Sequence, residues 1–356
     1  MRNIYLQILE QKNEISSLAL ATVTSTSGSS PQKPGSSALF NMSRLVAGTV
    51  GGGVFEGRVE KIARQAISAK KSVQYTYNLA NDISAKNEAI CGGTISALID
   101  ANLQNSVDVF EQLGASLGKG IPGVLITMVN PYSEQMVLVN RYWMSNEYTP
   151  DIPEELLSSI KPEVMAMLRA GDPSGYKQMY LSMPGEEPVS RFCLEAVFPL
   201  PRLVIAGAGH IGKSLAHLGN LLDFQVTVID DRGDFANTVN IPDADHIVVG
   251  NIGESIRDIP KGRDTYVVIV TRGHADDAEA LKQCIGSDAA FVGMIGSKHK
   301  VAAMKESFLA NGWATPEQWN MVFSPVGLDI KSKTVEEIAV SIAAQLVLVR
   351  NSAKQD

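Results

Sequence analysis

The chain has 356 residues, of which 45% are hydrophobic and 19% charged, and its formal net charge is −7. This length exceeds what one hydrophobic core usually serves, so we expect two or three domains in an ordinary globular protein. The acidic balance argues against a nucleic-acid partner, and no apolar run is long enough to span a bilayer. The first residues, 1–14, are typical of an amphipathic helix and lack the features of a signal peptide.

The three cysteines, Cys91, Cys193 and Cys284, are odd in number and widely spaced. This pattern favours free thiols in a reducing compartment, so we expect a cytoplasmic protein. The cysteines also lack the paired spacing of a zinc or iron–sulfur site, and we predict no metal site built from them.

The first candidate binding segment follows a predicted strand at Leu18–Thr24. The segment Ser25–Ser37 is rich in Ser, Gly and Pro, and composition alone would favour a flexible connection. Because it lies between two apolar segments inside a domain, a ligand-binding loop is the stronger interpretation. Its candidate contacts are Gly28, Ser29 and Ser30.

A second glycine-rich segment, Gly51-Gly52-Gly53, follows the apolar run Leu45–Val50 and precedes a predicted helix at Val54–Ala69. Glycine backbone before a helix can approach an anion closely. Glu56 lies in the first turn of this helix. Its carboxylate is either a ligand contact or a charge that favours the helix dipole, and the sequence leaves both interpretations open.

A third segment contains Cys91, Gly92 and Gly93, between a predicted strand at Val73–Leu79 and another at Ile95–Ile99. A free cysteine is most often a small buried hydrophobic residue. Beside two glycines at a turn, however, Cys91 could be an accessible thiolate.

The middle of the chain, residues 106–200, contains predicted helices and strands but no motif typical of a catalytic, binding or metal site. We predict helices near Val107–Leu117 and Pro153–Leu168, a hairpin of Val124–Val129 and Gln135–Val139, and strands near Gln178–Met183 and Phe192–Val197. The predicted domains are residues 1–118, a middle α+β segment 119–200 that could belong to the first domain, and 201–356. Pro199-Leu200-Pro201 forms a rigid boundary before the last of these.

The region 202–232 has the pattern of a βαβ unit, with G-x-G-x-x-G opening a helix directly after an apolar strand. Gly207 allows the tight turn, Gly209 lets the backbone approach a phosphate, and Gly212 lets helix and strand pack closely. Asp230 ends the second strand about 20 residues on, where an acid can bond a ribose hydroxyl. A nucleotide such as NAD is therefore expected in this crevice.

Beyond Arg232 the chain alternates between short apolar strands and helices. We predict strands at His246–Val249, Tyr266–Thr271 and Phe291–Ile295, and helices near Ala275–Ile285, Lys298–Asn311 and Val335–Arg350. This alternation predicts an α/β fold in which a C-terminal Rossmann-like, doubly wound parallel sheet follows an N-terminal α+β domain. His274 with Asp276 and Asp277 could suggest a metal site, but helix-start acids and a solvated histidine are commoner.

Taken together and in order, these motifs resemble the XdhC/CoxI family. The resemblance rests on Gly28–Pro31 with Pro34-Gly35, Gly48–Gly53 with Glu56, Cys91–Gly93, and the C-terminal runs GAGHIG, VTVIDDR, VTRGHADDAEAL, FVGMIGSKHK and SPVGLDI. It implies a xanthine dehydrogenase accessory protein. Such a protein binds molybdenum cofactor (molybdopterin), supports its sulfuration by a cysteine desulfurase, and inserts it into a xanthine dehydrogenase-type molybdenum hydroxylase.

On this interpretation the protein is a non-catalytic maturation factor, and we expect a homodimer. Many relatives have a cysteine in the glycine-rich segment where this sequence has Val54. On this interpretation either Cys91 alone is the thiolate for metal or sulfur handling, or the protein has a narrower role. The candidate cofactor-binding residues are Gly28, Ser29, Ser30, Gly51, Gly52, Gly53, Glu56, Gly92, Gly93, Gly207, Gly209, His210, Gly212, Asp230, Arg232 and His274.

Two other functions compete with this one. The Rossmann unit could serve an NAD-dependent oxidoreductase, although no acid–base pair for hydride chemistry stands out in the sequence. The chain could also be a regulatory nucleotide-sensing module. Turnover of nicotinamide would favour the oxidoreductase, whereas tight binding without turnover would favour the other two.

Overall fold

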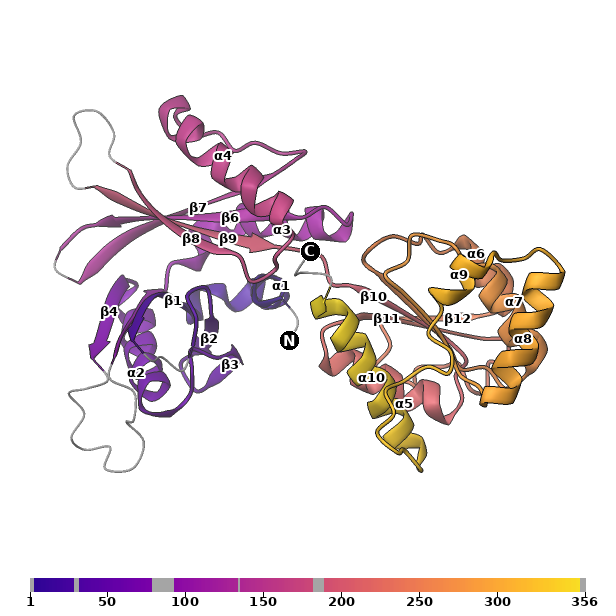
Figure 1. Cartoon of the computed structure of the whole chain (residues 1–356). Coiled ribbons are helices and arrows are strands. Elements are labelled where there is room, and N and C mark those ends of the chain that lie inside the picture. Colours follow the sequence, from indigo (N-terminus) through magenta and orange to yellow (C-terminus); the bar gives the residue numbers. More distant parts are fainter. Residues whose placement is uncertain (1–2, 29–31, 79–92, 134, 182–188, 353–356) are drawn as a thin grey trace. The chain divides into compact units, whose positions relative to one another are not determined.

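The computed structural model describes residues 3–28, 32–78, 93–133, 135–181 and 189–352. The chain forms two compact units, Met1–Pro199 and Leu200–Asp356. The first combines an antiparallel sheet with helices, and the second has a parallel sheet between helices, as Figure 1 shows. The predicted α/β fold class is therefore confirmed.

The first unit is built on one nine-stranded sheet in which every neighbouring pair is antiparallel. Its strand order is β3-β2-β1-β5-β4-β7-β6-β9-β8. The strands are β1 (Leu18–Gly28), β2 (Ser37–Asn41), β3 (Leu45–Gly48), β4 (Ser72–Asn78), β5 (Gly93–Asp100), β6 (Gly123–Pro131), β7 (Met136–Ser145), β8 (Tyr176–Leu181) and β9 (Ser190–Val197). The middle of the chain thus continues the sheet that the N-terminal strands begin.

Successive residues of a strand point to opposite faces of the sheet, and here both faces carry apolar side chains. Helices pack on these faces and bury them. The helices are α1 (Ile4–Glu10), α2 (Gly53–Ala69), α3 (Val107–Gly118) and α4 (Glu154–Ala170), with the 3-10 segments η1 (Lys12–Ser17) and η3 (Leu103–Ser106). The helix α2 packs on Ala19, Ala21 and Val23 of β1. The helix α4 packs on β6, β7 and β9, and Figure 1 shows it over that part of the sheet.

The face of β1 that points away from α2 and the face of β6 that points away from α4 contribute to one shared core. Leu18 and Leu20 of β1 pack with Leu125 of β6, with Trp143 of β7 and with apolar residues of α1 and α3. The two parts of the sheet therefore face each other across an interior layer. This interior also contains an ion pair between Arg141 and Asp100, whose side chains are only 2% and 1% exposed.

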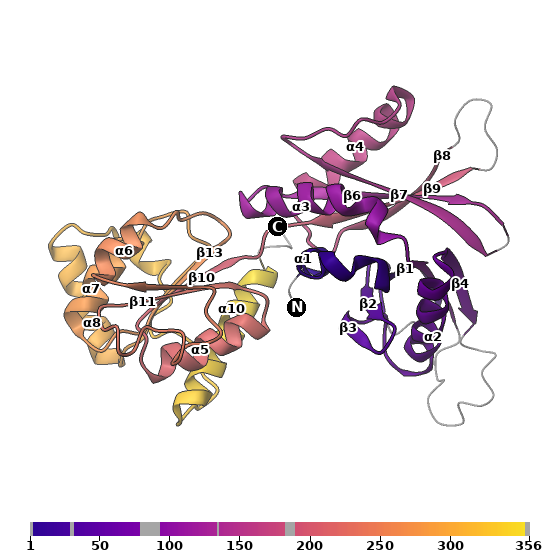
Figure 2. The same cartoon turned by 180° about the vertical axis from the view of Figure 1, so that it is seen from behind.

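The second unit is a five-stranded parallel sheet in the order β12-β11-β10-β13-β14. Its elements are β10 (Arg202–Ala206), α5 (His210–Leu221), β11 (Gln225–Asp230), β12 (His246–Val249), α6 (Ile252–Asp258), β13 (Thr265–Ile269), α7 (His274–Lys282), β14 (Phe291–Met294), α8 (Lys298–Ala310), α9 (Pro316–Asn320) and α10 (Val335–Ser352). The helices α5 and α10 cover one face, and α6, α7, α8 and α9 cover the other. Figure 2 shows α5 and α10 side by side from behind.

One expectation about local structure was wrong, and two short helices were not predicted. Ser25–Gly28 do not start the predicted loop but extend β1, because they pair with Gly93–Ser96 of β5. The helices α6 and α9 escaped prediction, since each is a short element of seven and five residues with too few turns for a clear apolar period.

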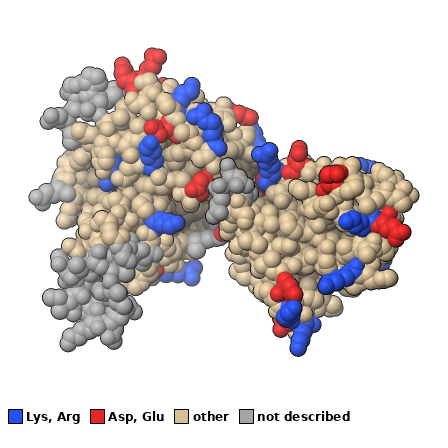
Figure 3. All heavy atoms as spheres, in the orientation of Figure 1, with Lys and Arg blue, Asp and Glu red and all other residues tan. Residues whose placement is uncertain are grey.

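The surface of the described residues is mixed in charge. On the face drawn in Figure 3, Lys and Arg side chains lie among Asp and Glu in both units. Within the same described ranges, no helix has the length and apolar character needed to cross a bilayer.

The buried Arg141–Asp100 pair generates a stability prediction. Arg141→Met leaves Asp100 buried without its cation, so we expect the free energy of unfolding to fall by about 3 kcal/mol. Lys177→Met breaks the exposed pair with Glu163, whose side chains are 47% and 34% exposed, and should cost less than about 1 kcal/mol. Hydrogen exchange of the β1 and β5 amides measures both. Equal effects of the two substitutions would contradict the buried pairing.

Candidate functional site

The glycine turn of the second unit has the geometry that the motif predicts. Gly207 has φ +116°, and a Cβ there would lie 2.5 Å from the Val270 carbonyl oxygen. A Cβ on Gly212 would lie 1.9 Å from the Gly207 oxygen, so helix and turn pack too closely for any side chain. Gly209, in contrast, has nothing within 4 Å of its ideal Cβ position. The backbone at the start of α5 is therefore open to an approaching group.

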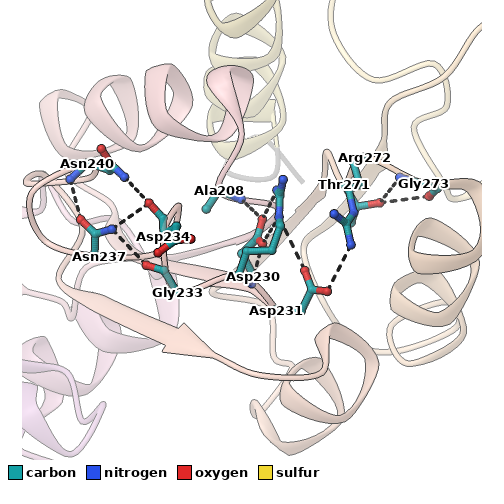
Figure 4. Close-up of polar contacts among 11 residues, drawn as sticks. Ala208, Asp230, Asp231, Gly233, Asp234, Asn237, Asn240, Thr271, Arg272 and Gly273 are labelled. Atoms are coloured by element: carbon teal, nitrogen blue, oxygen red, sulfur yellow. Dashed lines mark hydrogen bonds and ion pairs between the residues drawn. The ribbon is translucent and has the colours of Figure 1, made fainter.

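Asp230 holds this turn against the end of β11. Its carboxylate accepts hydrogen bonds from the Ala208 backbone N–H at 2.8 Å and from the Arg232 backbone N–H at 3.0 Å. The Arg232 guanidinium adds two more, from Nε at 2.8 Å and Nη2 at 2.9 Å. Figure 4 shows these contacts beside the Arg272–Asp231 pair. A ribose hydroxyl at this position would compete with Arg232 for the carboxylate.

The charge of Asp230 is stabilised by these donors. Burial of this side chain, which is 1% exposed, raises its pKa, but the hydrogen bonds from Arg232 and Ala208 outweigh burial and bring the pKa to about 2. Because the folded pKa lies below the ordinary 3.8, the carboxylate stabilises the fold above that pH, and the contribution is lost as the pH falls toward 2. Asp230 is therefore ionised and paired with Arg232 at neutral pH.

The two predicted histidines lie on exposed helix starts in this unit. His210 is the first residue of α5 and lines a cavity of about 650 Å³ with Lys213, His217, Asp243 and Glu336. His274 is the first residue of α7. The neighbouring Asp277 is fully buried, accepts a hydrogen bond from Thr271 and pairs with Lys300. Among the described residues, no three His, Cys, Asp or Glu side chains are grouped so that they could hold a metal ion.

The backbone of the glycine segment before α2 surrounds the carboxylate of Glu56. Gly51, Gly52 and Gly53 all have positive φ, at 123°, 68° and 58°. The Glu56 carboxylate accepts hydrogen bonds from the Thr49 hydroxyl at 2.6 Å, the Val50 N–H at 3.0 Å and the Gly52 N–H at 3.3 Å. Burial raises the pKa of Glu56, but these bonds outweigh it and lower the pKa overall. These bonds fit the interpretation of Glu56 as a charge at the helix start, and its role as a ligand contact stays a prediction.

Gly28 and Gly93, from two different candidate segments, are brought together. They are register partners at the ends of β1 and β5, and the Thr94 N–H donates to the Ser27 hydroxyl oxygen at 3.3 Å. The first turn of α2 is tied to the neighbouring strand, because Phe55 contacts Tyr77 with ring centroids 6.0 Å apart. Ser29, Ser30, Cys91 and Gly92 lie outside the described residues.

Sequence reasoning missed a polar group inside the first unit. Glu195 and Cys193 of β9 point to the same face, where their register partners on β8 are Tyr176 and Gln178. The Tyr5 hydroxyl donates to Glu195 Oε2 at 2.7 Å, although the two residues are 190 positions apart. The only local signal is the alternation of polar residues with Phe192 and Leu194, which also fits a strand with one solvated face.

Two family models match this chain. The model described as the XdhC Rossmann domain matches residues 203–346, and the model described as the XdhC and CoxI family matches residues 14–78. These segments contain the GAGHIG turn and the glycine-rich segment with Glu56, respectively.

Individual relatives agree with these matches. The chain is 24% identical over 349 residues to a Bacillus subtilis protein described as a probable subunit of xanthine dehydrogenase, covering 96% of this chain and 95% of that one. It is 30% identical over 154 residues to "Uncharacterized protein YqeB" of Escherichia coli, of which it covers 28%. A solved structure described as a xanthine dehydrogenase from Bacillus halodurans has a TM-score of 0.75 at 24% identity, over 99% of this chain and 97% of that one. At this identity it shows the fold alone.

The glycine geometry generates a matched pair of substitutions. Gly212→Ala forces a methyl group against the Gly207 carbonyl, and we expect a loss of at least about 2 kcal/mol of stability. Gly209→Ala meets no atom, and its φ of −72° suits alanine, so the loss should stay below about 1 kcal/mol. Urea denaturation followed by tryptophan fluorescence compares the two variants. If Gly209→Ala were the more destabilising, the packing described for this turn would be wrong.

Proposed function

The chain belongs to the XdhC and CoxI family, and on this premise we propose that it is an accessory protein for a xanthine dehydrogenase-type molybdenum hydroxylase. In this role it binds molybdenum cofactor as cargo, supports the sulfuration of that cargo by a cysteine desulfurase, and delivers it to the hydroxylase. The observation that carries the proposal is that the two family models match both units, each at a glycine-rich turn before a helix.

The geometry of these turns fits an anionic cargo of this chemistry. Molybdopterin carries a phosphate or a dinucleotide, and glycine backbone can approach such groups closely. Cβ positions on Gly52 and Gly209 meet nothing within 4 Å, so both turns leave open space beside the backbone. In the first unit the pairing of Gly28 with Gly93 also brings two of the candidate segments together where the strands β1 and β5 meet at their ends.

The alternative function, an NAD-dependent oxidoreductase, is favoured by the open Gly209 backbone at the start of α5. Against it, Asp230, the acid predicted to bind a ribose hydroxyl, already accepts four hydrogen bonds from Ala208 and Arg232. These bonds would have to rearrange before Asp230 could bind a dinucleotide in the usual way.

The proposed cargo is tested by composition. We expect protein purified anaerobically from cells that make molybdenum cofactor to contain molybdenum and pterin in nearly equal, substantial amounts. Metal analysis and the fluorescence of the oxidised pterin measure the two. If both are missing while the same cells load other cofactor-binding proteins, and the chain oxidises or reduces nicotinamide nucleotides, the oxidoreductase is the correct function.

Cys91 is the proposed residue for metal or sulfur handling, since a thiolate is a soft ligand and a sulfur acceptor. We expect Cys91→Ser to keep its bound pterin but to lower activation of the partner hydroxylase at least tenfold. Cys284→Ala is the matched control, because that thiol is fully buried in the second unit. Full activation by a correctly folded Cys91→Ser variant would remove Cys91 from the mechanism.

A further inference from the structure

A cavity of about 430 Å³ in the first unit lies apart from the glycine turns described above. It is lined by the segment Gln32–Ser36, by Pro173–Gly175, by Tyr176 and by Glu195. The segment is anchored on β1, because the Gly35 N–H donates to the Val23 oxygen and the Val23 N–H to the Ser36 oxygen, both at 2.8 Å. This volume is within the range of small-molecule sites.

The positions of Gly35 and Tyr176 define one wall of the cavity. Gly35 has φ +91°, and a Cβ there would lie 3.2 Å from Cδ2 of Tyr176. The backbone of the segment therefore lies directly on the aromatic ring. Tyr176 in turn is the register partner of Glu195, so the ring and the carboxylate lie side by side on adjacent strands.

Glu195 is the acidic group of this cavity. Its Oε2 accepts the Tyr5 hydroxyl at 2.7 Å, whereas Oε1 has no hydrogen-bond partner among the described residues. The Arg141 guanidinium, which lowers the pKa of Glu195, forms an ion pair with Asp100 and donates to the Ser106 hydroxyl oxygen. Burial raises the pKa of Glu195 to about 7, against the lowering effects of Tyr5 and Arg141. At physiological pH this side chain is therefore poised between its neutral and its charged form.

The arrangement suits a flat heteroaromatic ring with adjacent N–H donors. A carboxylate with one oxygen free of protein donors favours a ligand that donates to it, because hydrogen bonds to an ionised acceptor are stronger than neutral ones. The 2-amino and N3–H groups of a pterin form such a donor edge. The exposed Lys33 lines the same cavity and suits a phosphate at the other end of the ligand. The Ser36 and Ser174 hydroxyls also line it, but they already donate to Gln32 and Asp172.

From this geometry we infer that the cavity is the pterin subsite of the cargo, with Glu195 accepting from the pterin N–H edge and Lys33 facing the phosphate. The inference rests on the proposed function and makes it more specific. It assigns recognition of the pterin to the first unit, on residues that are not in either glycine turn. Tyr5 acts as a positioning residue, since its hydroxyl holds the carboxylate through Oε2.

The test measures binding of 6-hydroxymethylpterin to the full-length chain through quenching of pterin fluorescence. We expect binding by the wild type, and at least tenfold weaker binding by Glu195→Gln, whose amide keeps the shape and the Tyr5 contact but loses the charge. Glu163→Gln, which changes an exposed carboxylate of α4, is the matched control and should bind like the wild type. Equal affinity of Glu195→Gln and wild type would overturn the inference.

A second variant tests the cavity independently, in case Glu195→Gln does not fold. Ser174 is exposed at the cavity, so Ser174→Trp should fill the space without disturbing the core. We expect it also to bind 6-hydroxymethylpterin at least tenfold more weakly. Unchanged affinity in a folded Ser174→Trp protein would place the pterin elsewhere.

Binding should also depend on pH. The groups that face Glu195 are Tyr5 of α1, Arg141 of β7, Tyr176 of β8 and Cys193 of β9. Burial raises the pKa of Tyr5, Tyr176 and Cys193, so these groups stay neutral while Glu195 ionises. Affinity should therefore rise severalfold from pH 6 to pH 8 in the wild type and stay constant in Glu195→Gln. A pH profile that persists in Glu195→Gln would contradict the assignment.

Failure of this inference differs from failure of the proposed function. If the wild type isolated from cells carries molybdenum and pterin, and Glu195→Gln carries as much, the accessory role stands and the subsite is wrong. If the isolated protein carries neither but binds 6-hydroxymethylpterin through Glu195, the subsite stands as a pterin site and the cargo is wrong.

Discussion

The hydrogen bond from the Ala208 N–H to Asp230 joins the two ends of the βαβ unit on which the second unit is built. It closes the turn that Gly207 begins, and it fixes the end of β11 beside the start of α5. Arg232 completes the arrangement by donating three hydrogen bonds to the same carboxylate. The remaining strands extend from this pair in the order expected of a doubly wound sheet.

In the first unit a carboxylate also accepts hydrogen bonds from a glycine-rich turn, at the start of α2. Glu56 gathers Thr49, Val50 and Gly52 around its carboxylate, so the backbone bends sharply into α2. In both units, then, an internal carboxylate satisfies the N–H groups of a glycine-rich turn. These internal bonds pair backbone N–H groups that would be costly to leave unpaired. An external anion can bind the same N–H groups only by displacing the carboxylate.

The nine-stranded sheet of the first unit contributes a polar interior rather than a purely apolar one. Its two parts face each other, and Glu195, Arg141 and Cys193 lie on strand faces that turn inward. The cost of burying these groups is offset by Tyr5 and by the Arg141–Asp100 pair. Burial in this interior raises the pKa of the Glu195 carboxyl to about 7. This property connects the fold of the sheet to the proposed recognition of a pterin.

The sequence by itself determined the elements whose signals are local. Apolar periodicity located most of the strands and long helices, and the G-x-G-x-x-G spacing predicted the turn in which Gly212 contacts Gly207. The T-x-x-E spacing of residues 334–337 is that of a capping box, and Thr334 and Glu337 exchange hydrogen bonds at 3.0 and 3.2 Å before α10. All of these depend on residues within one or two turns of each other, and such contacts can be inferred from spacing.

Only the tertiary structure decided which distant residues meet. Tyr5 and Glu195 are 190 positions apart, and no periodicity relates them. The extension of β1 through Ser25–Gly28 depends on its pairing with β5, which overrides a composition typical of a loop. Arg232 lies only two positions from Asp230, but its bonds to that carboxylate depend on side-chain direction at the end of a strand and not on spacing. Strand register and side-chain direction are properties of the folded chain, and for that reason the polar cavity of the first unit could not be predicted from sequence.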